Sequence, residues 1–318
     1  MTTDYKSKIA YLSELIDNSI LPLITSDYVF WGLPYYSNPG DTLIWEGSLN
    51  MLKKCQYKCI GTCGWNDYKY IPLRKETVIL IIGGGFFGDL WRKAWSAVMD
   101  TITLYPDNPI VILPQSIYYE NKEIEKSDSE RLAKCKNLTI CLRDEVSYNY
   151  AKSHFSANKS ILVPDMAFHA NLDKFSLAIK KPNKQGLFLK RNDKEFPSGF
   201  SFDNNNCDIS DWPTMSGRSS LPYRFFDHYY RKLEPYKGSF SMWIKKQIMY
   251  YPHRFITLFD SIKFLSQYET VYSTRLHAAL LAWMIGRNVV IINNSYGKIG
   301  NLYNTWLKDC ENITIYEQ

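Results

Sequence analysis

The chain has 318 residues, of which 45% are hydrophobic and 22% are charged, a composition typical of globular proteins and unlike that of collagenous or disordered chains. Its 38 Lys and Arg residues exceed its 32 Asp and Glu residues by only six, a balance too small to indicate a general nucleic-acid binder, so no nucleic-acid partner is expected. The sequence begins without a secretory signal pattern and lacks an apolar run of about 18 residues, which predicts a cytoplasmic protein with reduced thiols.

Short apolar segments alternate with helical patterns through the first half of the sequence. A helical pattern at residues 5–20 precedes a predicted strand at 27–31, the turn SNPGD and a helix that begins near Thr42. Predicted strands follow at 58–62, 77–82, 110–113, 138–142 and 161–163, with helices after Gly88, at 127–136 and at 144–153. This succession predicts a parallel sheet that helices cover on both faces.

The second half contains a smaller set of the same kind, with strands at 186–189, 270–272 and 288–292 and a helix at 275–285. Pro164 and the polar segment 171–185 indicate a domain boundary between the two halves of the sequence. We therefore predict an α/β fold of two Rossmann-like domains that face each other across a cleft. The predicted domains are residues 1–168 and residues 169–318, the second with an insertion at about 196–256. Ligands in such sheets bind at the carboxyl ends of the strands.

The run GGGFFG that begins at Gly83 follows a predicted strand and has the spacing of a dinucleotide-binding turn. The acidic residue that should end the next strand is missing, because that strand runs into Pro114 and Gln115. No Lys-Ser or Lys-Thr pair follows the glycines, which excludes a Walker loop. What remains is either a backbone surface suited to close approach by a ligand or a plain turn.

The run Ser273-Thr274-Arg275-Leu276-His277 lies between a predicted strand and a predicted helix. Ser273 or Thr274 would cap the helix, which places Arg275 and His277 in its first turn. Backbone N–H groups near Leu276 and His277, the positive end of the helix dipole and the arginine fork together suit a phosphate or a carboxylate. The alternative is a surface arginine beside a histidine of the core.

Arg143 repeats this arrangement in the first half, because it ends a predicted strand and precedes Asp144, which would cap the next helix. The alternative here is an ordinary surface salt bridge. Two arginines at strand ends of opposite domains could close on one multiply charged anion. Arg191 and Lys298 are weaker candidates for the same cluster.

In these residues the chain resembles the polysaccharide pyruvyl transferase family. The motifs that carry the resemblance run in chain order, and they are Asn38-x-Gly40-Asp41, Gly83 to Gly85, Pro114-Gln115-Ser116, Leu142-Arg143-Asp144, Pro164-Asp165-Met166-Ala167-Phe168, Thr274-Arg275-Leu276-His277-Ala278 and Lys298. The resemblance implies a two-domain fold similar to that of GT-B glycosyltransferases. It also implies phosphoenolpyruvate as the donor, a sugar of a surface glycan or of its lipid-linked precursor as the acceptor, and a pyruvate ketal as the product. Residues 196–251 match no motif, so the acceptor stays open, with a hexose such as galactose as the candidate.

The resemblance places Arg143, Arg275, Leu276 and His277 at the phosphoenolpyruvate site, and we add Arg191 and Lys298 to that site. A donor with a carboxylate and a phosphate on three carbons needs at least two cationic forks and helix-end amides. His277 is predicted to protonate the vinyl carbon as the general acid, with Arg275 beside it.

Asp41 is predicted to orient or deprotonate the acceptor hydroxyl. Gly84, Gly85 and Gln115 are predicted to bind the acceptor together with it. The sequence contains no H-E-x-x-H motif and no D-x-D of the kind that holds a divalent ion. We therefore expect neither a metal nor a cofactor other than the donor substrate.

The segment 223–254, from Tyr223 to Arg254, combines aromatic and basic residues. Seven Lys and Arg residues against two acidic residues give it a net charge of +5, and ten of its 32 residues are aromatic. This pattern suits a membrane interface, where a lipid-linked acceptor would be met, and predicts a peripheral position on the inner face of the membrane. The alternative is a packed insertion whose aromatic residues fill the core.

Two other functions stay open because a fold alone does not define a function. One is a GT-B-like glycosyltransferase that uses a nucleotide sugar. The other is a glycan-binding module without catalytic activity.

Overall fold

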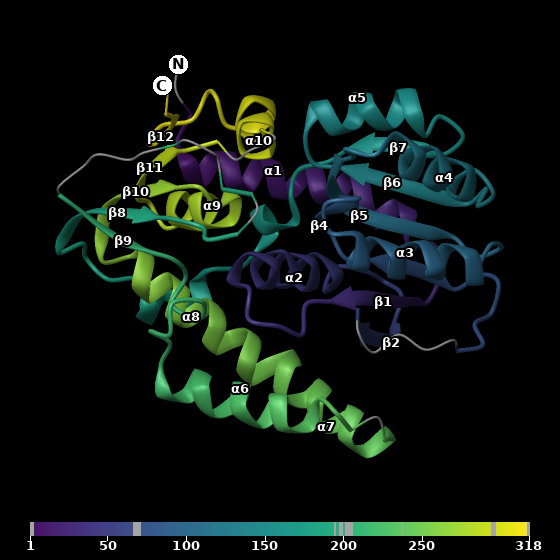
Figure 1. The fold of residues 1–318 in the computed structure, drawn as a ribbon, viewed down its shortest axis with the longest axis horizontal. Helices are drawn as coiled ribbons and strands as arrows, with labels where there is room; N and C mark the ends of the chain where they lie inside the picture. The colour runs from purple at the N-terminus through teal and green to yellow at the C-terminus, as the bar shows by residue number, and fades with distance from the viewer. Residues whose placement is uncertain are drawn as a thin grey trace.

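The structure is a computed structural model that describes residues 3–65, 71–193, 195–196, 200, 206–236, 238–293 and 297–316. Within these residues the strands form two sheets in which the neighbouring strands are parallel. The two sheets lie side by side with helices packed around them (Figure 1). The prediction of an α/β fold with parallel sheets is confirmed.

The first sheet has the strand order β2-β1-β3-β5-β6-β7, with β4 paired to β5. Its strands are β1 (Tyr28–Leu33), β2 (Cys59–Gly64), β3 (Val78–Ile81), β4 (Gly84–Gly88), β5 (Ile110–Tyr118), β6 (Leu138–Leu142) and β7 (Lys159–Leu162). The second sheet has the order β12-β11-β10-β8-β9. Its strands are β8 (Lys184–Leu189), β9 (Cys207–Ser210), β10 (Tyr268–Ser273), β11 (Asn288–Ile291) and β12 (Ile313–Ile315).

The helices connect and cover these strands. The α-helices are α1 (Tyr5–Ile20), α2 (Pro39–Leu52), α3 (Arg92–Leu104), α4 (Lys122–Leu132), α5 (Glu145–His154), α6 (Leu221–Leu233), α7 (Ser239–Ile248), α8 (Arg254–Leu265), α9 (Leu276–Met284) and α10 (Lys298–Trp306). Shorter helical turns are η1 (Leu21–Leu23), η2 (Met166–His169), η3 (Asp173–Ala178) and the π-helical turn η4 (Met249–His253).

Several element boundaries differ from those predicted. The helix predicted at 127–136 begins earlier, as α4, because the Asn121 side chain accepts hydrogen bonds from the N–H groups of Glu123 and Ile124 and caps it there. The glycine-rich run predicted as a loop forms β4 along the extended end of β5. Strands β9 and β12 and the helices of residues 221–265 were not predicted, because the two strands have only four and three residues and the helical segment was interpreted from its aromatic and basic composition.

Side chains of the central strands alternate between two hydrophobic cores. Phe30 and Leu80 lie in one core, whereas their neighbours Trp31 and Ile81 lie in the other. Parallel strands that are buried on both faces produce this pattern, which is why the strand sequences read as continuous apolar runs.

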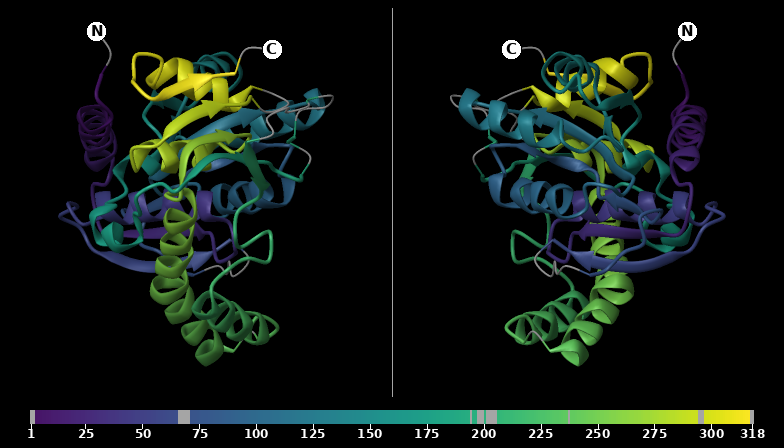
Figure 2. Two further views of the ribbon diagram at one scale, coloured as in Figure 1. Left: turned by 90° about the vertical axis from the view of Figure 1, so that its left-hand side faces the viewer. Right: turned by 90° about the vertical axis from the view of Figure 1, so that its right-hand side faces the viewer.

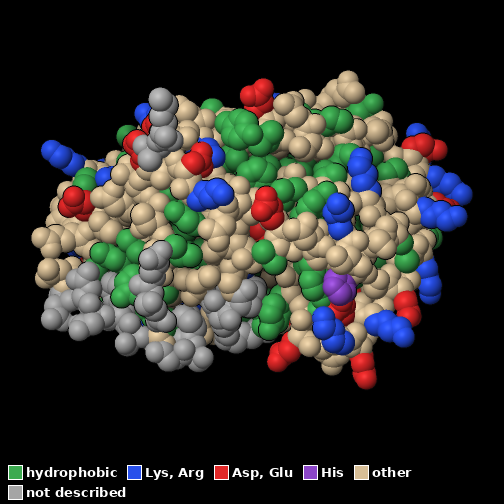
Figure 3. Space-filling model, turned by 90° about the horizontal axis from the view of Figure 1, so that it is seen from above, with side chains coloured by type: hydrophobic (Ala, Val, Ile, Leu, Met, Phe, Trp, Pro, Cys, Tyr) green, Lys and Arg blue, Asp and Glu red, His purple; other side chains and the backbone are tan. Residues whose placement is uncertain are grey.

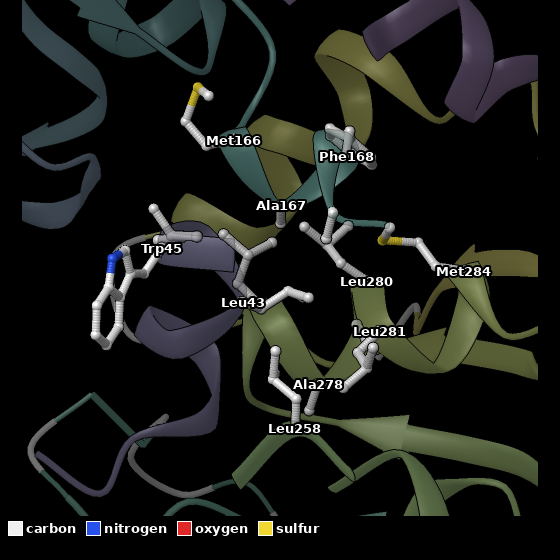
Figure 4. Packing of buried hydrophobic residues seen from close by; sticks show 14 of the residues in the cluster. Leu43, Trp45, Met166, Ala167, Phe168, Leu258, Ala278, Leu280, Leu281 and Met284 are labelled. Atoms are coloured by element: carbon white, nitrogen blue, oxygen red, sulfur yellow. The ribbon is translucent and has the colours of Figure 1, made fainter. Parts of the chain in front are cut away.

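Helix α2 packs closely against η2. A Cβ atom at Gly47 would overlap the backbone carbonyl of Met166, so only glycine allows this approach. Around this contact, side chains of α2, η2 and α9 such as Leu43, Ala167 and Leu280 point toward one another (Figure 4). This packing joins the loop after β7 to both the N-terminal and the C-terminal parts of the chain.

The N-terminal helix α1 lies against elements of the second sheet. The ring of Tyr5 meets that of Trp283 edge-on, with centroids 6.2 Å apart, and Thr3 forms a parallel bridge with Cys310. Thr3, near the start of the chain, therefore lies beside Cys310 of the C-terminal part. The division into domains 1–168 and 169–318 stays a prediction.

Helices α6 and α7 form an arm that projects away from both sheets (Figures 1 and 2). The base of the neighbouring helix α8 is fixed by Arg254, which pairs with the buried Glu46 of α2, and Lys174 pairs with the same carboxylate. Residues 197–199, 201–205 and 237 of the predicted insertion lie outside the described residues. On the face turned away from the arm, basic and acidic side chains are interspersed (Figure 3).

Candidate active site

A single cavity of about 650 Å³ collects the residues predicted for the donor site. Its lining includes all six of them: Arg143, Arg191, Arg275, Leu276, His277 and Lys298. Asp41 and Gly85, predicted for the acceptor, line it as well. Arg143 follows β6 of the first sheet, whereas Arg275 follows β10 of the second. The structure thus brings the strand ends of both sheets to one cavity.

Arg143 is held rigidly at the end of β6 and is only 1% exposed. Its Nε donates to Ser116 Oγ at 2.9 Å, and Nη1 donates to Asp165 Oδ2 at 2.7 Å. Ser116 in turn donates to Asp144, which caps α5 through the N–H of Ser147, as the sequence predicted. The Arg143 side chain therefore needs no ligand to be ordered.

Gly85 allows cations from the two halves of the chain to approach each other. A Cβ atom at Gly85 would lie 2.9 Å from Nη2 of Arg143 and 3.4 Å from Nζ of Lys298. Because no side chain stands there, both cations flank the same backbone segment of β4.

His277 is joined to Arg143 through a shared carboxylate. Its Nε2 lies 3.2 Å from Asp165 Oδ2, the oxygen that also accepts from Arg143. Burial alone would raise the pKa of Asp165, but His277 and Arg143 hold it well below its usual value. The Nδ1 atom faces Gly40, where a Cβ would lie only 3.1 Å away.

Arg275 is fixed from the second sheet by Asp211. Its Nε and Nη2 donate to the two carboxylate oxygens at 2.6 and 2.7 Å, a bidentate pair. Its Nη1 lies 3.6 Å from Asp193, beyond hydrogen-bond distance. Within the described part of the chain, neither Nη1 of Arg275 nor Nη2 of Arg143 donates a hydrogen bond, so each guanidinium keeps a donor for a ligand.

The prediction that Ser273 or Thr274 caps the following helix is wrong. Ser273 Oγ accepts from the N–H of Arg275, and Thr274 Oγ1 accepts from the N–H of Arg191, because both hydroxyls tie the end of β10 to neighbouring backbone. Arg275 itself occupies the cap position, and no side chain caps α9. The N–H groups of Leu276 and His277 therefore begin the helix at the cavity wall.

Lys298, Arg191 and Glu195 form a buried cluster on the same wall. Glu195 accepts from Arg191 at 2.7 Å, from Trp91 Nε1 at 3.1 Å, and pairs with Lys298. Burial would raise the pKa of Glu195, but Lys298 and Arg191 lower it to about 2. Burial lowers the pKa of the Lys298 ammonium to about 8 despite this partner.

Asp41 lies in the first turn of α2, whose cap is Asn38. Its Oδ2 accepts from Asn38 Nδ2 at 2.7 Å and from the Tyr36 hydroxyl at 2.9 Å. All three residues, Tyr36, Asn38 and Asp41, line the cavity, so the two hydrogen bonds orient the Asp41 carboxylate beside it.

Gln115 and Gly84 support the cavity rather than line it. The Gln115 side chain is fully buried, donates to the carbonyl of Ile82 at 2.9 Å and accepts from the N–H of Phe86 at 3.4 Å. Gly84 has φ +154° and pairs with Gln115 in the sheet. These two residues shape the β4 backbone next to Gly85.

Sequence reasoning missed the carboxylates that pair with the cations of the site. Asp165 belongs to a motif that carries the family resemblance, but no role in the site was predicted for it. Asp193, Glu195 and Asp211 were not predicted as site residues at all. Asp193 and Glu195 pair with the nearby Arg191, whereas Asp211 pairs with Arg275 and Glu195 also with Lys298, both of which are distant in sequence. A signal was present only for Asp165, which directly follows a strand and Pro164.

Two kinds of feature are absent from the described residues. They contain no helix whose length and apolar character would let it cross a membrane. They also contain no group of three or more His, Cys, Asp or Glu residues arranged to hold a metal ion.

The structure is that of an α/β protein in which the strand ends of two parallel sheets form one cavity lined by several cationic side chains. The family model for polysaccharide pyruvyl transferases matches residues 38–296, and the chain belongs to this family.

Individual relatives agree with this assignment. The chain is 31% identical to the EpsO protein of Bacillus subtilis over 303 residues, covering 93% of this chain and 89% of the relative. It is 25% identical to pyruvyl transferase 1 of Schizosaccharomyces pombe over 301 residues, covering 88% of this chain and 69% of the relative. A solved structure of an uncharacterized protein from Klebsiella pneumoniae has the same fold, with a TM-score of 0.59, 17% identity and full coverage of both chains.

Proposed function

We propose that this protein transfers the pyruvyl group of phosphoenolpyruvate to two hydroxyls of a hexose, galactose being one candidate, in a lipid-linked capsular or exopolysaccharide precursor. The product is a pyruvate ketal, and phosphate is released. The observation that carries the proposal is the single cavity that Arg143 lines from the first sheet and Arg275, His277 and Lys298 line from the second.

The donor is proposed to bind through the groups that the protein leaves unbonded. A carboxylate already pairs with each of four cations, namely Arg143, Arg191, Arg275 and Lys298, so the site as a whole is close to neutral. A trianion would be held by Nη2 of Arg143, Nη1 of Arg275 and the first N–H groups of α9. The internal carboxylates fix the cations in place, which lowers the entropic cost of binding.

His277 is proposed to be the general acid. Asp165 binds its Nε2 and stabilises the imidazolium, so the proton given to the vinyl carbon comes from Nδ1, beside Gly40. The vinyl CH₂ becomes a methyl group and C2 becomes an oxocarbenium-like centre. One sugar hydroxyl then attacks C2 and loses its proton, the C2–O bond to phosphate breaks, and the second hydroxyl closes the ketal as its proton leaves with phosphate.

Asp41 is proposed to orient or deprotonate the attacking hydroxyl, because it lines the same cavity as His277. Gly85 and the backbone beside Gly84 and Gln115 would form the neighbouring wall of the acceptor site. The proposed reaction uses no metal and no cofactor, since the charges of phosphoenolpyruvate are met by side chains and backbone. We also propose that the two sheets correspond to two Rossmann-like domains in a GT-B-like arrangement, with the cavity between them.

The proposed lipid-linked acceptor favours a peripheral position on the cytoplasmic face of a membrane, with the α6–α7 arm as the contact surface. Phe225, Phe240 and Trp243 on this arm are 55%, 74% and 58% exposed, and Arg224 and Lys232 are exposed beside them. Exposed aromatic rings with basic residues suit an anionic lipid surface. Lys245 and Arg254, which the sequence placed in this basic set, are buried and are excluded from the lipid-binding surface.

Sedimentation with vesicles tests the arm. The protein should sediment with vesicles that contain anionic lipid and far less with zwitterionic ones, and Phe240→Ser with Trp243→Ser should reduce the association about tenfold. Leu177→Ser, at an equally exposed apolar residue outside the arm, is the matched control. Association that survives both the double substitution and neutralisation of Arg231, Lys232 and Lys246 contradicts the membrane proposal.

Ligand-dependent melting separates this function from its alternatives. Phosphoenolpyruvate should raise the melting temperature and a nucleoside diphosphate should not. The reverse result would favour a glycosyltransferase, and a response to glycan alone would favour a binding module.

The reaction itself is tested by incubating lipid-linked oligosaccharides with phosphoenolpyruvate. Mass spectrometry should then show the mass gain of one pyruvate ketal. Absence of both the mass gain and of phosphate release with all acceptors would refute the proposal.

A further inference from the structure

Among the described residues that line the cavity, three large hydrophobic side chains are at least 38% exposed. They are Tyr36 at 39%, Trp91 at 38% and Met215 at 43%. By contrast, Trp31 and Ile81 of the same lining are at most 4% exposed and belong to the hydrophobic core. The three exposed side chains therefore offer apolar surface to a molecule in the cavity.

The two aromatic rings of this set are each held by a polar edge. Trp91 Nε1 donates to Glu195 Oε1 at 3.1 Å, and the Tyr36 hydroxyl donates to Asp41 Oδ2 at 2.9 Å. Both carboxylates belong to the charged part of the site, since Glu195 also pairs with Lys298 and Asp41 lines the cavity. The indole N–H lies in the plane of its ring, so its hydrogen bond fixes the ring without covering either face. Each ring is thus positioned relative to the charged groups before a ligand binds.

The position of Trp91 is not explained by the helix that it begins. Trp91 is the N-cap of α3, and its side chain makes no capping hydrogen bond. Ser, Thr, Asp and Asn are preferred at this position, because their oxygens accept from the first N–H groups of the helix, whereas an indole has a donor and no acceptor. Trp91 also comes three residues after the end of β4. Ligands bind at such strand ends in parallel sheets.

The chemistry of an indole face indicates which ligand it suits. The face carries partial negative charge, so it attracts the weakly positive C–H groups of a sugar ring and leaves the hydroxyls at the ring edge free to form hydrogen bonds. Phosphoenolpyruvate offers no such surface, because its carboxylate and phosphate are negatively charged. In a galactopyranoside the hydrogens on C3, C4 and C5 lie on one face, which gives the ring an apolar side. The exposed indole therefore fits the acceptor and not the donor.

We propose that Trp91 is a stacking platform for the acceptor, which is a pyranoside with a C–H face, and that Glu195 holds this platform through the indole N–H. This inference rests on the proposed function, because it takes the sugar to be the acceptor. Glu195 connects the indole to Lys298, so a sugar stacked on Trp91 lies next to the cations of the donor site.

Two substitutions separate the face of the ring from its N–H group. Trp91→Phe keeps an aromatic face and loses the N–H, whereas Trp91→Gln keeps an N–H donor and loses the face. Methyl β-galactoside is titrated into the full chain by calorimetry. Its affinity should fall about tenfold in Trp91→Gln and by less than about threefold in Trp91→Phe. If the hydrogen bond to Glu195 were the whole role of Trp91, the order would be reversed.

Saturation-transfer NMR with the same galactoside shows which side of the sugar meets the protein. Transfer should be strongest to the hydrogens on C3, C4 and C5 in wild type and in Trp91→Phe, and this pattern should be lost in Trp91→Gln. Tyr11→Ala is the control, because Tyr11 is 53% exposed on α1 and does not line the cavity, so the affinity should stay at the wild-type value.

Several results would overturn the proposal. They are absence of galactoside binding, unchanged affinity in Trp91→Gln, and a loss in Trp91→Phe as large as that in Trp91→Gln. Displacement of the galactoside by a nucleoside diphosphate would also overturn it, since a base can stack on the same ring. Phosphate release from phosphoenolpyruvate is measured separately. Galactoside binding that depends on the ring, in a protein that never releases phosphate, would support the platform and refute the proposed function.

Discussion

Asp165 is the residue that connects the two halves of the site. Its buried carboxylate accepts from Arg143 and His277, one from each sheet, and their charges keep its pKa low. A buried carboxylate between two cations is stabilising only while all three groups are present, because removal of one leaves the others without compensation.

Asp165→Asn should therefore lower the free energy of unfolding by about 3 kcal/mol at pH 7. Because the folded-state pKa of Asp165 is depressed, its contribution is present above the unfolded pKa of about 4 and is lost as the pH falls below it. Urea unfolding at pH 7 and at pH 3 should show a difference between wild type and variant that narrows at the lower pH. Asp107→Asn, which breaks an exposed pair with Lys75, is the control and should change stability by less than about 1 kcal/mol. An equal effect of the two substitutions at pH 7 would contradict this account.

Lys298 predicts an alkaline limit to donor binding. Its pKa of about 8 means that the ammonium loses its charge above that pH, and affinity for phosphoenolpyruvate should fall there. The fold is not lost at the same time, since a lysine with a lowered folded pKa makes stability rise with pH between about 8 and 10. Lys298→Arg keeps the charge and should bind the donor with little change up to pH 9.5. Calorimetry from pH 7 to 9.5 checks this, and a wild-type affinity that stays constant over the range would exclude the role of Lys298.

Motifs at strand ends allowed the cations of the site to be predicted from the sequence, but not their partners. Arg143, Arg275 and His277 each follow a recognisable strand, so their convergence follows from the topology of parallel sheets. Asp211 and Glu195 lie in segments without a periodic pattern, and their position depends on how the chain returns to the cavity. Lys245 was expected to be exposed but is buried. The sequence alone does not reveal how a basic residue among aromatic ones is packed.

At the scale of elements, the N-terminus of α2 meets the N-terminus of α9. Gly40 of α2 faces His277 of α9 without an intervening side chain, and the Asn38 cap holds this end of α2 in place. The helix and the turn before it were predicted from the sequence. Their contact with α9 was not, since it joins residues separated by more than 200 positions.

Gly40→Ala should impair catalysis without unfolding the protein. The added Cβ would lie 3.0 Å from Cβ of His277 and 3.1 Å from its Nδ1, closer than ordinary contact, so the imidazole must shift. A small misplacement of a catalytic group costs up to about a hundredfold in rate, and we expect kcat for phosphate release to fall at least tenfold with little change in melting temperature. Gly61→Ala in β2, where the new Cβ would meet only ordinary contacts, should leave kcat unchanged. Unaltered kcat in Gly40→Ala would show that the ring does not need this position.

At the scale of the whole molecule, two parallel sheets place their strand ends around one cavity. An arm of two helices extends from the second half of the chain (Figure 1). The alternation of apolar strands and helices was sufficient to predict the sheets. The arm was recognised in the sequence only as an aromatic and basic segment, and its helices α6 and α7 keep large apolar residues such as Phe240 and Trp243 exposed.

Cations from both sheets are proposed to bind one phosphoenolpyruvate molecule, and calorimetric titration with the donor checks this. Wild type should bind one donor per chain. Arg143→Lys and Arg275→Lys, which keep the charge but lose the planar fork, should each lower the affinity about tenfold or more, in proteins whose melting temperatures show that they are folded. Unchanged affinity in either variant would mean that the donor is not held between the two sheets, and the account would be wrong.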